Sequence, residues 1–365
     1  MEQDKQVLVS GASFAGLTTA YWMNKMGYRV TVVEIGHHLK KGGTPVDIKD
    51  STVDIVKRMG LLEQIKANSI GVKKWEFKNA DDSTANAIVL DQLPVNEFEI
   101  ERDVLLNMLF ELVKNDVCFL FNNSIVSLSE KEGGIDVTFK DGTQNSFTCV
   151  FGCDGIHSAV RRSWFGNETE YVHFLGQYFS IAIINKLLIE ESTLQLYAEP
   201  NKGIMLNAYN NKTDIVFSFR PEKEIPYDFR NQEQHKQIVA AQMEGMGWRA
   251  AELQKEMLHA ASFYFDKFCQ VKMPSWTKGR VALVGDAGYC ASPAAGMGGS
   301  LAIIGATALA DAFEKHHGDV QLAFAEYNNS LRPFIDEIQA TAVETLDKLL
   351  PRTEEEIRWR NQHGF

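Results

Sequence analysis

Residues 7–16 read Val-Leu-Val-Ser-Gly-Ala-Ser-Phe-Ala-Gly, and a helical run to Met26 follows them. The apolar start predicts a short buried strand, and the glycines after it predict a tight turn that opens a helix. Gly27 ends this helix, and Val30 to Val33 then form a second apolar strand before Glu34. Strand, turn, helix and strand in this order make a βαβ unit, which places the chain in the α/β class.

The turn after the first strand fits the dinucleotide-binding pattern G-x-G-x-x-G with one change. Gly11 and Gly16 occupy the outer glycine positions, and Ser13 occupies the middle one, where the backbone approaches a pyrophosphate. Glu34 follows Gly11 by 23 residues, about where an acid holds a ribose 2′-hydroxyl. A simple tight turn is the alternative, but the second strand and the acid favour a cofactor. Gly11, Ser13, Ala15, Gly16 and Glu34 are therefore candidate cofactor-binding residues.

A second ligand-binding turn lies near the other end of the chain. The apolar strand Val281 to Val284 runs into Gly285-Asp286, and a glycine-dense loop then opens a helix over Leu301 to Ala310. The Asp286 carboxylate would accept hydrogen bonds from the hydroxyls of a sugar-like chain, and the small loop residues let backbone N–H groups approach a ligand closely. One long cofactor would span both turns, and their combination indicates FAD. The candidate residues here are Asp286, Pro293, Gly296, Met297, Gly298 and Gly299.

The composition suits an enzyme that acts on small molecules. The chain has 365 residues, 45% hydrophobic and 23% charged, enough for one large core or two moderate ones. A net charge of −11 without a long basic run argues against nucleic acid or an anionic membrane as a partner. Five scattered cysteines and nine histidines form neither a disulfide framework nor a metal-ligand pattern. No signal peptide or membrane span is recognisable, so we expect a cytoplasmic location.

Three segments together resemble the fingerprints of the single-component, class A flavoprotein monooxygenases with the aromatic-hydroxylase fold. They are Gly11 to Glu34, Cys153 to Arg161 (Cys-Asp-Gly-Ile-His-Ser-Ala-Val-Arg), and Gly285 to Gly299. In this order and separation they cover nearly the whole chain. Within that class, Phe263 to Asp266 and Ser275 to Arg280 look like the tetracycline-inactivating monooxygenases and their relatives.

The resemblance also implies roles for three further residues. Arg102, in Glu-Arg-Asp, matches a residue that contacts the phosphate or ribityl chain of the flavin; otherwise it would be a solvated arginine in the first turn of a helix. Asp47, in Gly-Thr-Pro-Val-Asp, matches a loop beside the isoalloxazine, although it could be a surface acid. Asp154 belongs to a motif with a dual role in FAD and nicotinamide binding. It can equally cap the helix that carries Ser158 and Arg161.

The resemblance implies an FAD-dependent monooxygenase. NAD(P)H, with NADPH favoured, would reduce FAD, and O₂ would add to give a C4a-hydroperoxyflavin that hydroxylates a planar aromatic, phenolic or polyketide substrate. Because this chemistry lies in the cofactor, we name no protein catalytic residue, and the sequence identifies neither a general base nor the substrate pocket. The flanking matches make tetracycline-like antibiotics candidate substrates. Met297 and Ser300, however, replace amide side chains of the corresponding loop in those enzymes.

Two alternatives stay open. An FAD-dependent oxidase or reductase of the same fold would carry the same turns, whereas a flavin halogenase is disfavoured because its W-x-W-x-I-P signature is missing. A non-catalytic flavoprotein could instead sequester a planar ligand. Incorporation of oxygen into a product separates a monooxygenase from the first alternative. Tight ligand binding that leaves NAD(P)H consumption unchanged would favour the second.

The distribution of elements predicts a chain with two domains, of which the cofactor domain is discontinuous, and we expect the protein to be a monomer. An FAD-binding, Rossmann-like domain of the aromatic hydroxylase and glutathione reductase type is expected from residues 1–72, 98–170 and 262–318. A substrate-binding domain with an antiparallel sheet is expected from residues 73–97 and 171–261, and C-terminal helices from 319–365. Local patterns predict a loop over 39–48, a hairpin that pairs 135–139 with 147–151, and helices over 234–257 that break near Gly245 and Gly247.

Overall fold

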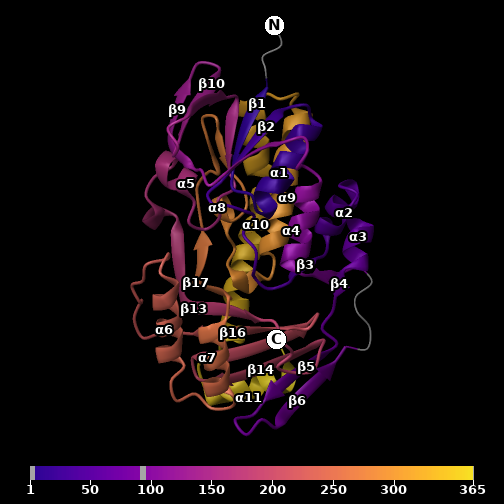
Figure 1. Ribbon diagram of the computed structural model, residues 1–365, viewed down its shortest axis with the longest axis vertical. Helices are drawn as coiled ribbons and strands as arrows, with labels where there is room; N and C mark the ends of the chain where they lie inside the picture. The colour runs from indigo at the N-terminus through magenta and orange to yellow at the C-terminus, as the bar shows by residue number, and fades with distance from the viewer. Residues whose placement is uncertain (1–4, 91–95, 365) are drawn as a thin grey trace.

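The computed structural model describes residues 5–90 and 96–364. Residues 1–4, at the start that lacks a signal-peptide pattern, residues 91–95, in the predicted segment 73–97, and Phe365 lie outside the described residues. Figure 1 shows a six-stranded sheet with its helices in the upper half of the view and a seven-stranded sheet in the lower half. These two halves are called the upper lobe and the lower lobe below. The predicted mixed α/β class is confirmed.

The predicted βαβ unit forms the centre of the six-stranded sheet. β1 (Gln6–Ser10), α1 (Phe14–Lys25) and β2 (Arg29–Glu34) follow in the expected order, and β1 pairs in parallel with both β2 and β12 (Cys149–Gly152). Val7, Leu8 and Val9 are fully buried, because a central parallel strand covered on both faces has no side toward solvent. The order is β18-β19-β12-β1-β2-β8, with β18 (Thr277–Lys278), β19 (Val281–Leu283) and β8 (Cys118–Phe121).

Helices cover this sheet and position the predicted turns. α1 packs against α9 (Gly298–Lys315) and α4 (Arg102–Glu111), and the Trp22 indole N–H donates to the Thr307 hydroxyl at 2.9 Å between α1 and α9. α9 also contacts α2 (Ser51–Arg58) and α10 (Val320–Leu349). The shorter helices of this lobe are α3 (Leu62–Ala67), α5 (Ala159–Trp164), α8 (Asp286–Tyr289), η1 (Glu168–Glu170) and η2 (Pro293–Ala295).

The hairpin prediction is right at its turn and wrong at its far end. β10 (Gly134–Phe139) pairs with β11 (Gln144–Phe147) and with β9 (Ile125–Lys131). Residues 149–151, predicted to continue the hairpin, belong to β12 of the parallel sheet. At the junction the Thr148 N–H donates to the Gln6 carbonyl at 2.7 Å. A continuous apolar run that is buried on both faces suits the middle of a parallel sheet better than an exposed hairpin.

The seven-stranded sheet has the order β17-β13-β16-β15-β14-β5-β6. Its strands are β13 (Val172–Ile184), β14 (Thr193–Glu199), β15 (Lys202–Tyr209), β16 (Lys212–Phe219) and β17 (Ser262–Val271), joined by β5 (Lys74–Lys78) and β6 (Thr84–Val89). Neighbours are antiparallel except β14 and β5. α6 (Gln232–Gln242) and α7 (Ala250–His259) cover one face, where Tyr178 and Phe217 pack with Leu253, and the predicted break lies between these helices.

The opposite face of this sheet turns toward the upper lobe. Phe179 alternates with Tyr178 on β13 and packs with Phe268, Ala294 of η2 and Leu346 of α10. α10 therefore runs from α9 in the upper lobe to the lower sheet, as Figure 1 shows. It continues through Pro333 as one helix, although proline removes a backbone donor there. α11 (Glu354–His363) follows and packs against β6 and β14, so the C-terminal part is helical as predicted.

A small three-stranded sheet lies between the two lobes. It has the order β3-β7-β4, with β3 (Val46–Ile48), β7 (Phe98–Ile100) and β4 (Ser69–Ile70). The loop predicted over 39–48 therefore ends in a strand, in which Val46 pairs with Ile100 and Ile48 with Phe98, and both isoleucines are fully buried in the upper core. Asp47 points away from that core, in register with Glu99.

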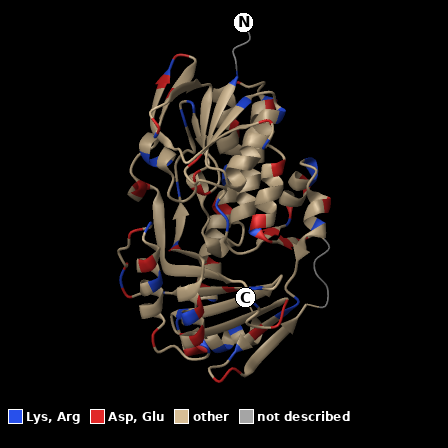
Figure 2. Ribbon diagram, in the orientation of Figure 1, with Lys and Arg blue, Asp and Glu red and all other residues tan. Residues whose placement is uncertain are grey.

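Charged residues of both signs are interspersed over the two lobes (Figure 2). None of the helices formed by residues 5–90 and 96–364 is long and apolar enough to cross a bilayer.

Candidate functional site

The turn at residues 11–16 is built by close backbone approach. A Cβ at Gly11 would lie 2.4 Å from the Cys153 carbonyl oxygen, and the residue has φ +105°. A Cβ at Gly16 would lie 1.9 Å from the carbonyl oxygen of Gly11. Both glycines are therefore required for β1 to lie against β12 and for α1 to start directly above the turn. The first turn of α1 carries no acidic side chain, which leaves its positive end open to an anion.

Glu34 folds back over this turn from the end of β2. Its Oε2 accepts the Ala12 N–H at 2.9 Å, and its Oε1 accepts the Gly36 N–H at 2.8 Å. Each carboxylate oxygen keeps a further lone pair for a hydroxyl group. Glu34 thus holds the turn and remains available to a ribose, which fits the role predicted for it.

Ser13 and Arg102 are brought together at the mouth of the turn. Arg102 donates to the Ser13 hydroxyl at 3.1 Å and to the carbonyls of Lys40 and Gly42, both at 3.0 Å. Its guanidinium also lies 5.2 Å from the ring centre of Phe14. These contacts hold a positive charge beside the start of α1, where a pyrophosphate would lie.

Ala15 joins the two predicted turns to each other. A Cβ at Gly285 would lie 3.1 Å from that of Ala15 and 3.5 Å from that of Ala302 in α9. Asp286, which follows, begins the short helix α8 rather than a loop. Burial raises the pKa of Asp286, against a hydrogen bond from Cys290 that lowers it. The fully buried Arg161 donates to the Ala287 carbonyl at 2.8 Å and fixes α8 in place.

The glycine-rich loop lies against β3 and α1. The Ser300 hydroxyl donates to the Asp47 carbonyl at 2.8 Å, and a Cβ at Gly299 would lie 3.2 Å from the Phe14 ring. At Gly296 and Gly298, in contrast, an added Cβ would meet no atom within 4 Å among the described residues. Their backbones therefore border open space.

The remaining loop candidates and Asp47 lie around the same opening. Pro293 is exposed at the start of η2, and Met297 is buried just before α9. The Asp47 side chain is exposed, and partial enclosure raises its pKa. The segments that carry the predicted cofactor candidates other than Asp154 thus contact one another in a series from Glu34 to Asp47, and this series is called the path below.

The Asp154 carboxylate is committed to capping α5. It accepts the Ser158 hydroxyl at 2.5 Å and the backbone N–H groups of Ala159 at 2.8 Å and Val160 at 3.1 Å. Its backbone does border the cofactor turn, since a Cβ at Gly11 would lie 3.2 Å from the Asp154 Cα. Of the two roles weighed for this residue, the geometry favours the cap.

A second carboxylate cluster, centred on Asp266, was not identified from the sequence. Asp266 accepts the hydroxyls of Tyr264 at 2.7 Å and Tyr227 at 2.8 Å and the Lys267 N–H at 2.8 Å, and it lies 3.0 Å from His157 Nε2. Burial lowers the pKa of His157, but hydrogen bonds to Asp266 and Glu168 outweigh it and raise that pKa to about 9. The residues of this cluster come from four separate segments, so no local pattern announces it.

An open cavity of about 490 Å³ lies between the lobes. The upper lobe contributes the loop 40–43 and the start of α4 to its lining, and the lower lobe contributes Ile183, Tyr209, Lys212 and Phe263. The cavity shares Gly42, Gly43 and Arg102 with the path described above. A ligand held along that path therefore has space beside it against the lower sheet.

Comparison with known proteins agrees with this geometry. The sequence profile of the FAD binding domain matches residues 4–330. The uncharacterized protein Rv1260 of Mycobacterium tuberculosis is 34% identical, with 97% of this chain and 96% of that protein covered. A flavin-dependent monooxygenase of Legionella longbeachae is 33% identical, with 97% of this chain and 92% of that protein covered.

Two solved structures extend the likeness to three dimensions. Tetracycline destructase Tet(51) matches with a TM-score of 0.88 and 31% identity over 98% of this chain and 95% of that one. Tetracycline destructase Tet(55) matches with a TM-score of 0.87 and 32% identity over 100% of this chain and 98% of that one. The chain therefore belongs to the FAD-dependent monooxygenases of the single-component, aromatic-hydroxylase type, and it resembles the tetracycline destructases.

Proposed function

We propose that this oxidoreductase uses NAD(P)H and O₂ to hydroxylate a planar phenolic or enolic substrate held between the two lobes. The observation that carries the proposal is the continuous path from Glu34 to Asp47, which runs beside an interlobe cavity. Its open backbone at Gly296 and Gly298 leaves room for a flat ring system. A hydrolase or a metal enzyme has no use for such a path, whereas a long redox cofactor needs all of it.

The residues present fit FAD. Glu34 would bind the ribose, Gly11, Ser13, Ala15, Gly16 and Arg102 the pyrophosphate, and Asp286 the ribityl hydroxyls. Asp47, Pro293 and the backbone from Gly296 to Gly299 would border the ring. When bound, FAD supplies hydride acceptance and the activation of O₂. We also propose the cofactor and substrate domains with the boundaries given by the sequence, NADPH as the preferred reductant, a monomeric state and a cytoplasmic location.

The lower sheet supplies the substrate side of the site. Ile181 and Ile183 lie on the face of β13 that turns toward the upper lobe, and the buried Phe179 lies on the same face. Apolar side chains of this kind exclude water from a flat substrate and orient it against the cofactor path. The similarity to Tet(51) and Tet(55) supports a tetracycline as one substrate, and we propose tetracycline-like polyketides as the first class to examine.

The test is a holoenzyme assay. The purified protein should show flavin absorbance, and tetracycline or another aromatic polyketide should accelerate NADPH oxidation in air. Mass spectrometry with ¹⁸O₂ should then find one labelled oxygen atom in the product. Flavin without oxygen incorporation from any substrate in the panel would contradict the monooxygenase proposal and favour an oxidase or reductase. A ligand that binds without changing NAD(P)H consumption would favour a sequestering flavoprotein.

A matched pair of variants links the assay to the path. Arg102→Gln should reduce flavin retention after dialysis about tenfold or more, because a charge-assisted contact to phosphate is lost. Arg58→Gln removes an exposed arginine that pairs with Asp311 at 2.7 Å on the far side of α9, and it should retain flavin as the wild type does. Equal retention in both variants would contradict the assignment of Arg102.

A further inference from the structure

The tip of the β15–β16 hairpin forms part of the lower wall of the interlobe cavity. The chain turns there through Asn210 and Asn211, whose φ values of 46° and 60° are the left-handed conformation that a two-residue hairpin turn requires. Tyr209 and Lys212 pair with each other on either side of this turn, and both line the cavity. The turn therefore places one aromatic ring and one cation beside the space between the lobes.

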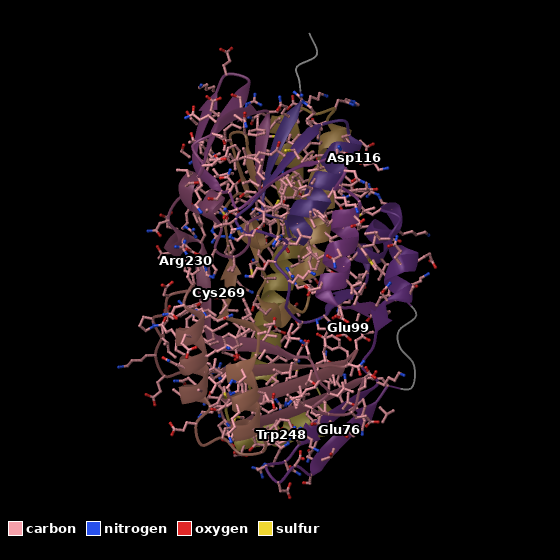
Figure 3. The ribbon with its side chains drawn as sticks, viewed as in Figure 1. Glu76, Glu99, Asp116, Arg230, Trp248 and Cys269 are labelled. Carbon is pink, nitrogen blue, oxygen red and sulfur yellow. The ribbon has the colours of Figure 1, made fainter. Side chains whose placement is uncertain are left out.

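Glu101 of the upper lobe fastens this tip. It lies between β7 and α4, and Figure 3 labels Glu99, two residues before it, between the upper helices and the lower sheet. The Oε1 atom of Glu101 accepts the Asn210 side-chain N–H at 2.6 Å, and its Oε2 atom accepts an ammonium N–H of Lys212 at 2.6 Å. The side chains of Glu101 and Lys212 are 13% and 35% exposed. One enclosed carboxylate thus holds both ends of the turn by charge-assisted hydrogen bonds.

Glu101 is itself fixed by the helix that follows it. Its carbonyl accepts the Val104 N–H at 3.0 Å and the Leu105 N–H at 3.2 Å, where α4 begins. Its side chain makes no capping bond to that helix and reaches the lower lobe instead. Arg102, the next residue, donates to Ser13 on the path. The position of the hairpin tip is therefore set relative to the cofactor path by two adjacent residues.

The Lys212 ammonium keeps donors for a ligand. An ammonium group has three N–H donors, and the bond to Glu101 is the one hydrogen bond that this side chain forms among the described residues. Lys212 also lines the cavity. Two of its donors are therefore available to an oxygen atom of a molecule held there.

The other charges of the cavity lining favour an anion as well. The acids of the lining are Glu101 and Asp103, and both are engaged, since Asp103 accepts a backbone N–H of the loop 40–43 at 2.9 Å. The lining also contains Lys40, Lys41 and Arg102. The two lysines form no ion pair within the part of the chain that the structure describes. A ligand with a negative charge would offset this excess of cations, whereas a neutral ligand would not.

Lys212 is the cation best prepared to bind that ligand. Arg102 already donates to the Ser13 hydroxyl and to two backbone carbonyls. Lys40 and Lys41 are exposed in a loop, so each would lose side-chain entropy on binding. Lys212 is held in one place by a carboxylate, and this part of the cost of binding has already been met in the folded protein.

We propose that Lys212 is a substrate-binding residue that holds an ionised oxygen of the substrate, and that Glu101 positions its ammonium group. This inference rests on the proposed hydroxylation, because it assigns the interlobe cavity to the substrate of that reaction. The oxygen belongs to an enolate, a phenolate or a carboxylate. Tyr209, Ile183 and Phe263 supply the aromatic and apolar surface beside it. The Tyr209 hydroxyl donates to Asp214 at 2.9 Å, which leaves the anion to Lys212.

The first test measures binding without turnover. The probes are anthraquinone-2-carboxylate and anthraquinone-2-carboxamide, which have the same shape and differ in charge. Quenching of tryptophan fluorescence in wild-type holoenzyme should show the carboxylate bound about tenfold more tightly, because a charge-assisted bond is gained. Lys212→Met should reduce this ratio to about twofold or less. The control Lys186→Met, which removes an exposed lysine of the lower lobe that pairs with Glu256 at 2.7 Å, should keep it.

Two outcomes of this titration overturn the proposal. One is a wild type that binds both probes equally, and the other is a Lys212→Met variant that keeps the wild-type ratio. The carboxamide serves as the control for folding, and its affinity should be the same in every variant.

The second test separates positioning from charge. Glu101→Gln removes a negative charge from the lining, so a purely electrostatic effect would strengthen binding of the carboxylate probe. Release of the Lys212 ammonium should instead weaken it by about two- to tenfold, the cost of ordering a free lysine side chain. Tighter or unchanged binding of the carboxylate in Glu101→Gln overturns the positioning role.

The third test asks which anion Lys212 serves. The phosphate groups of the reductant are the other anions that these cations attract. Lys212→Met should leave the Kd of NADP⁺ unchanged. A variant that loses affinity for NADP⁺ but not for the carboxylate probe overturns the proposal.

Turnover links the inference to the reaction. With the substrate that the ¹⁸O₂ assay identifies, Lys212→Met should raise KM about tenfold and change kcat by about twofold or less, because uniform binding is lost. An unchanged KM overturns the role of Lys212 and leaves the proposed function standing. Failure of oxygen incorporation in the wild type contradicts the proposed function, whereas the affinities of the two probes still decide whether Lys212 binds an anion.

Discussion

Asp266 and Glu99 both lie where the two lobes meet, yet burial has opposite outcomes for the pKa values of the two carboxylates. Burial raises the pKa of Asp266, but the hydrogen bond and charge of His157 and the Tyr264 hydroxyl outweigh it, so the net shift is downward. Around Glu99 and Asp214 the neighbours are carboxylates, and both pKa values rise to about 7. Donors and neighbouring charge, rather than depth, therefore decide whether a buried acid stays ionised. Asp266 joins His157 of the upper lobe to the lower sheet, whereas neither Glu99 nor Asp214 forms a salt bridge among the described residues.

Replacement of Asp266, whose carboxylate accepts several hydrogen bonds, should have the largest effect on the free energy of unfolding. Asp266→Asn leaves the His157 cation without its closest buried partner and weakens the bonds from Tyr227 and Tyr264. We expect the free energy of unfolding to fall by roughly 3 kcal/mol, as for other buried pairs from which one partner is removed. Urea denaturation at about pH 7 measures it. A loss below about 1 kcal/mol would show that Asp266 and Glu99 do not differ as described.

Replacement of Asp214 should have the opposite effect and increase the free energy of unfolding. The folded-state pKa of Asp214 is raised from 3.8 to about 7, so its contribution to stability is present below about pH 4 and is lost as pH rises through about 7. Asp214→Asn should therefore stabilise the protein at about pH 8 by roughly 2 kcal/mol, about half of what the full shift implies. Urea denaturation across this range should also give a flatter pH dependence than the wild type. Destabilisation at every pH would contradict the protonated Asp214.

His157, the cationic partner of Asp266, should make the stability of the protein depend on pH. Its folded-state pKa of about 9 lies above the ordinary 6.5, so its stabilisation is complete below about pH 6.5 and is lost as pH rises through about 9. His157→Gln should cost about 1 kcal/mol at pH 7, a modest value because the ring is 37% exposed. Thermal unfolding between about pH 6 and pH 9 should show a slope in the wild type that the variant lacks.

Phe229, whose ring stacks on His157, should have the smallest effect on the free energy of unfolding. Phe229 stacks on it with ring centres 5.2 Å apart and planes 19° apart, but it is half exposed. Phe229→Ala should change the free energy of unfolding by about 0.5 kcal/mol and leave the pH slope of the wild type in place. Loss of that slope would mean that the stack, and not Asp266, maintains the charge of His157.

The sequence predicted those parts of the site in which local spacing and function coincide. Gly11, Gly16 and Glu34 could be placed because a βαβ turn forces close backbone approach and puts an acid at the end of the next strand. The sequence was less informative where one residue fits two different patterns. Asp154 was left between a cofactor role and a cap. Residues 149–151 were assigned to a hairpin because so short an apolar run does not distinguish a hairpin strand from a parallel one.

Glu99 could not be recognised in the sequence. It reads as an ordinary strand acid, and its raised pKa comes from burial and from Asp47, which lies far from it along the chain. The same holds for Asp266, which appeared only as part of a family-like segment. Long-range contacts set the pKa of each group, and a single sequence contains no local trace of such contacts.

The strand order of the upper sheet has a consequence for biosynthesis. β1 emerges from the ribosome first, but its parallel partner β12 begins only at Cys149, and β19 begins at Val281. Until then one edge of β1, made of fully buried valine and leucine in the finished protein, has no partner and attracts other strands. The nascent chain must therefore carry an aggregation-prone edge on β1 until β12 has been synthesised. Slow translation before Cys149 should increase its dependence on chaperones.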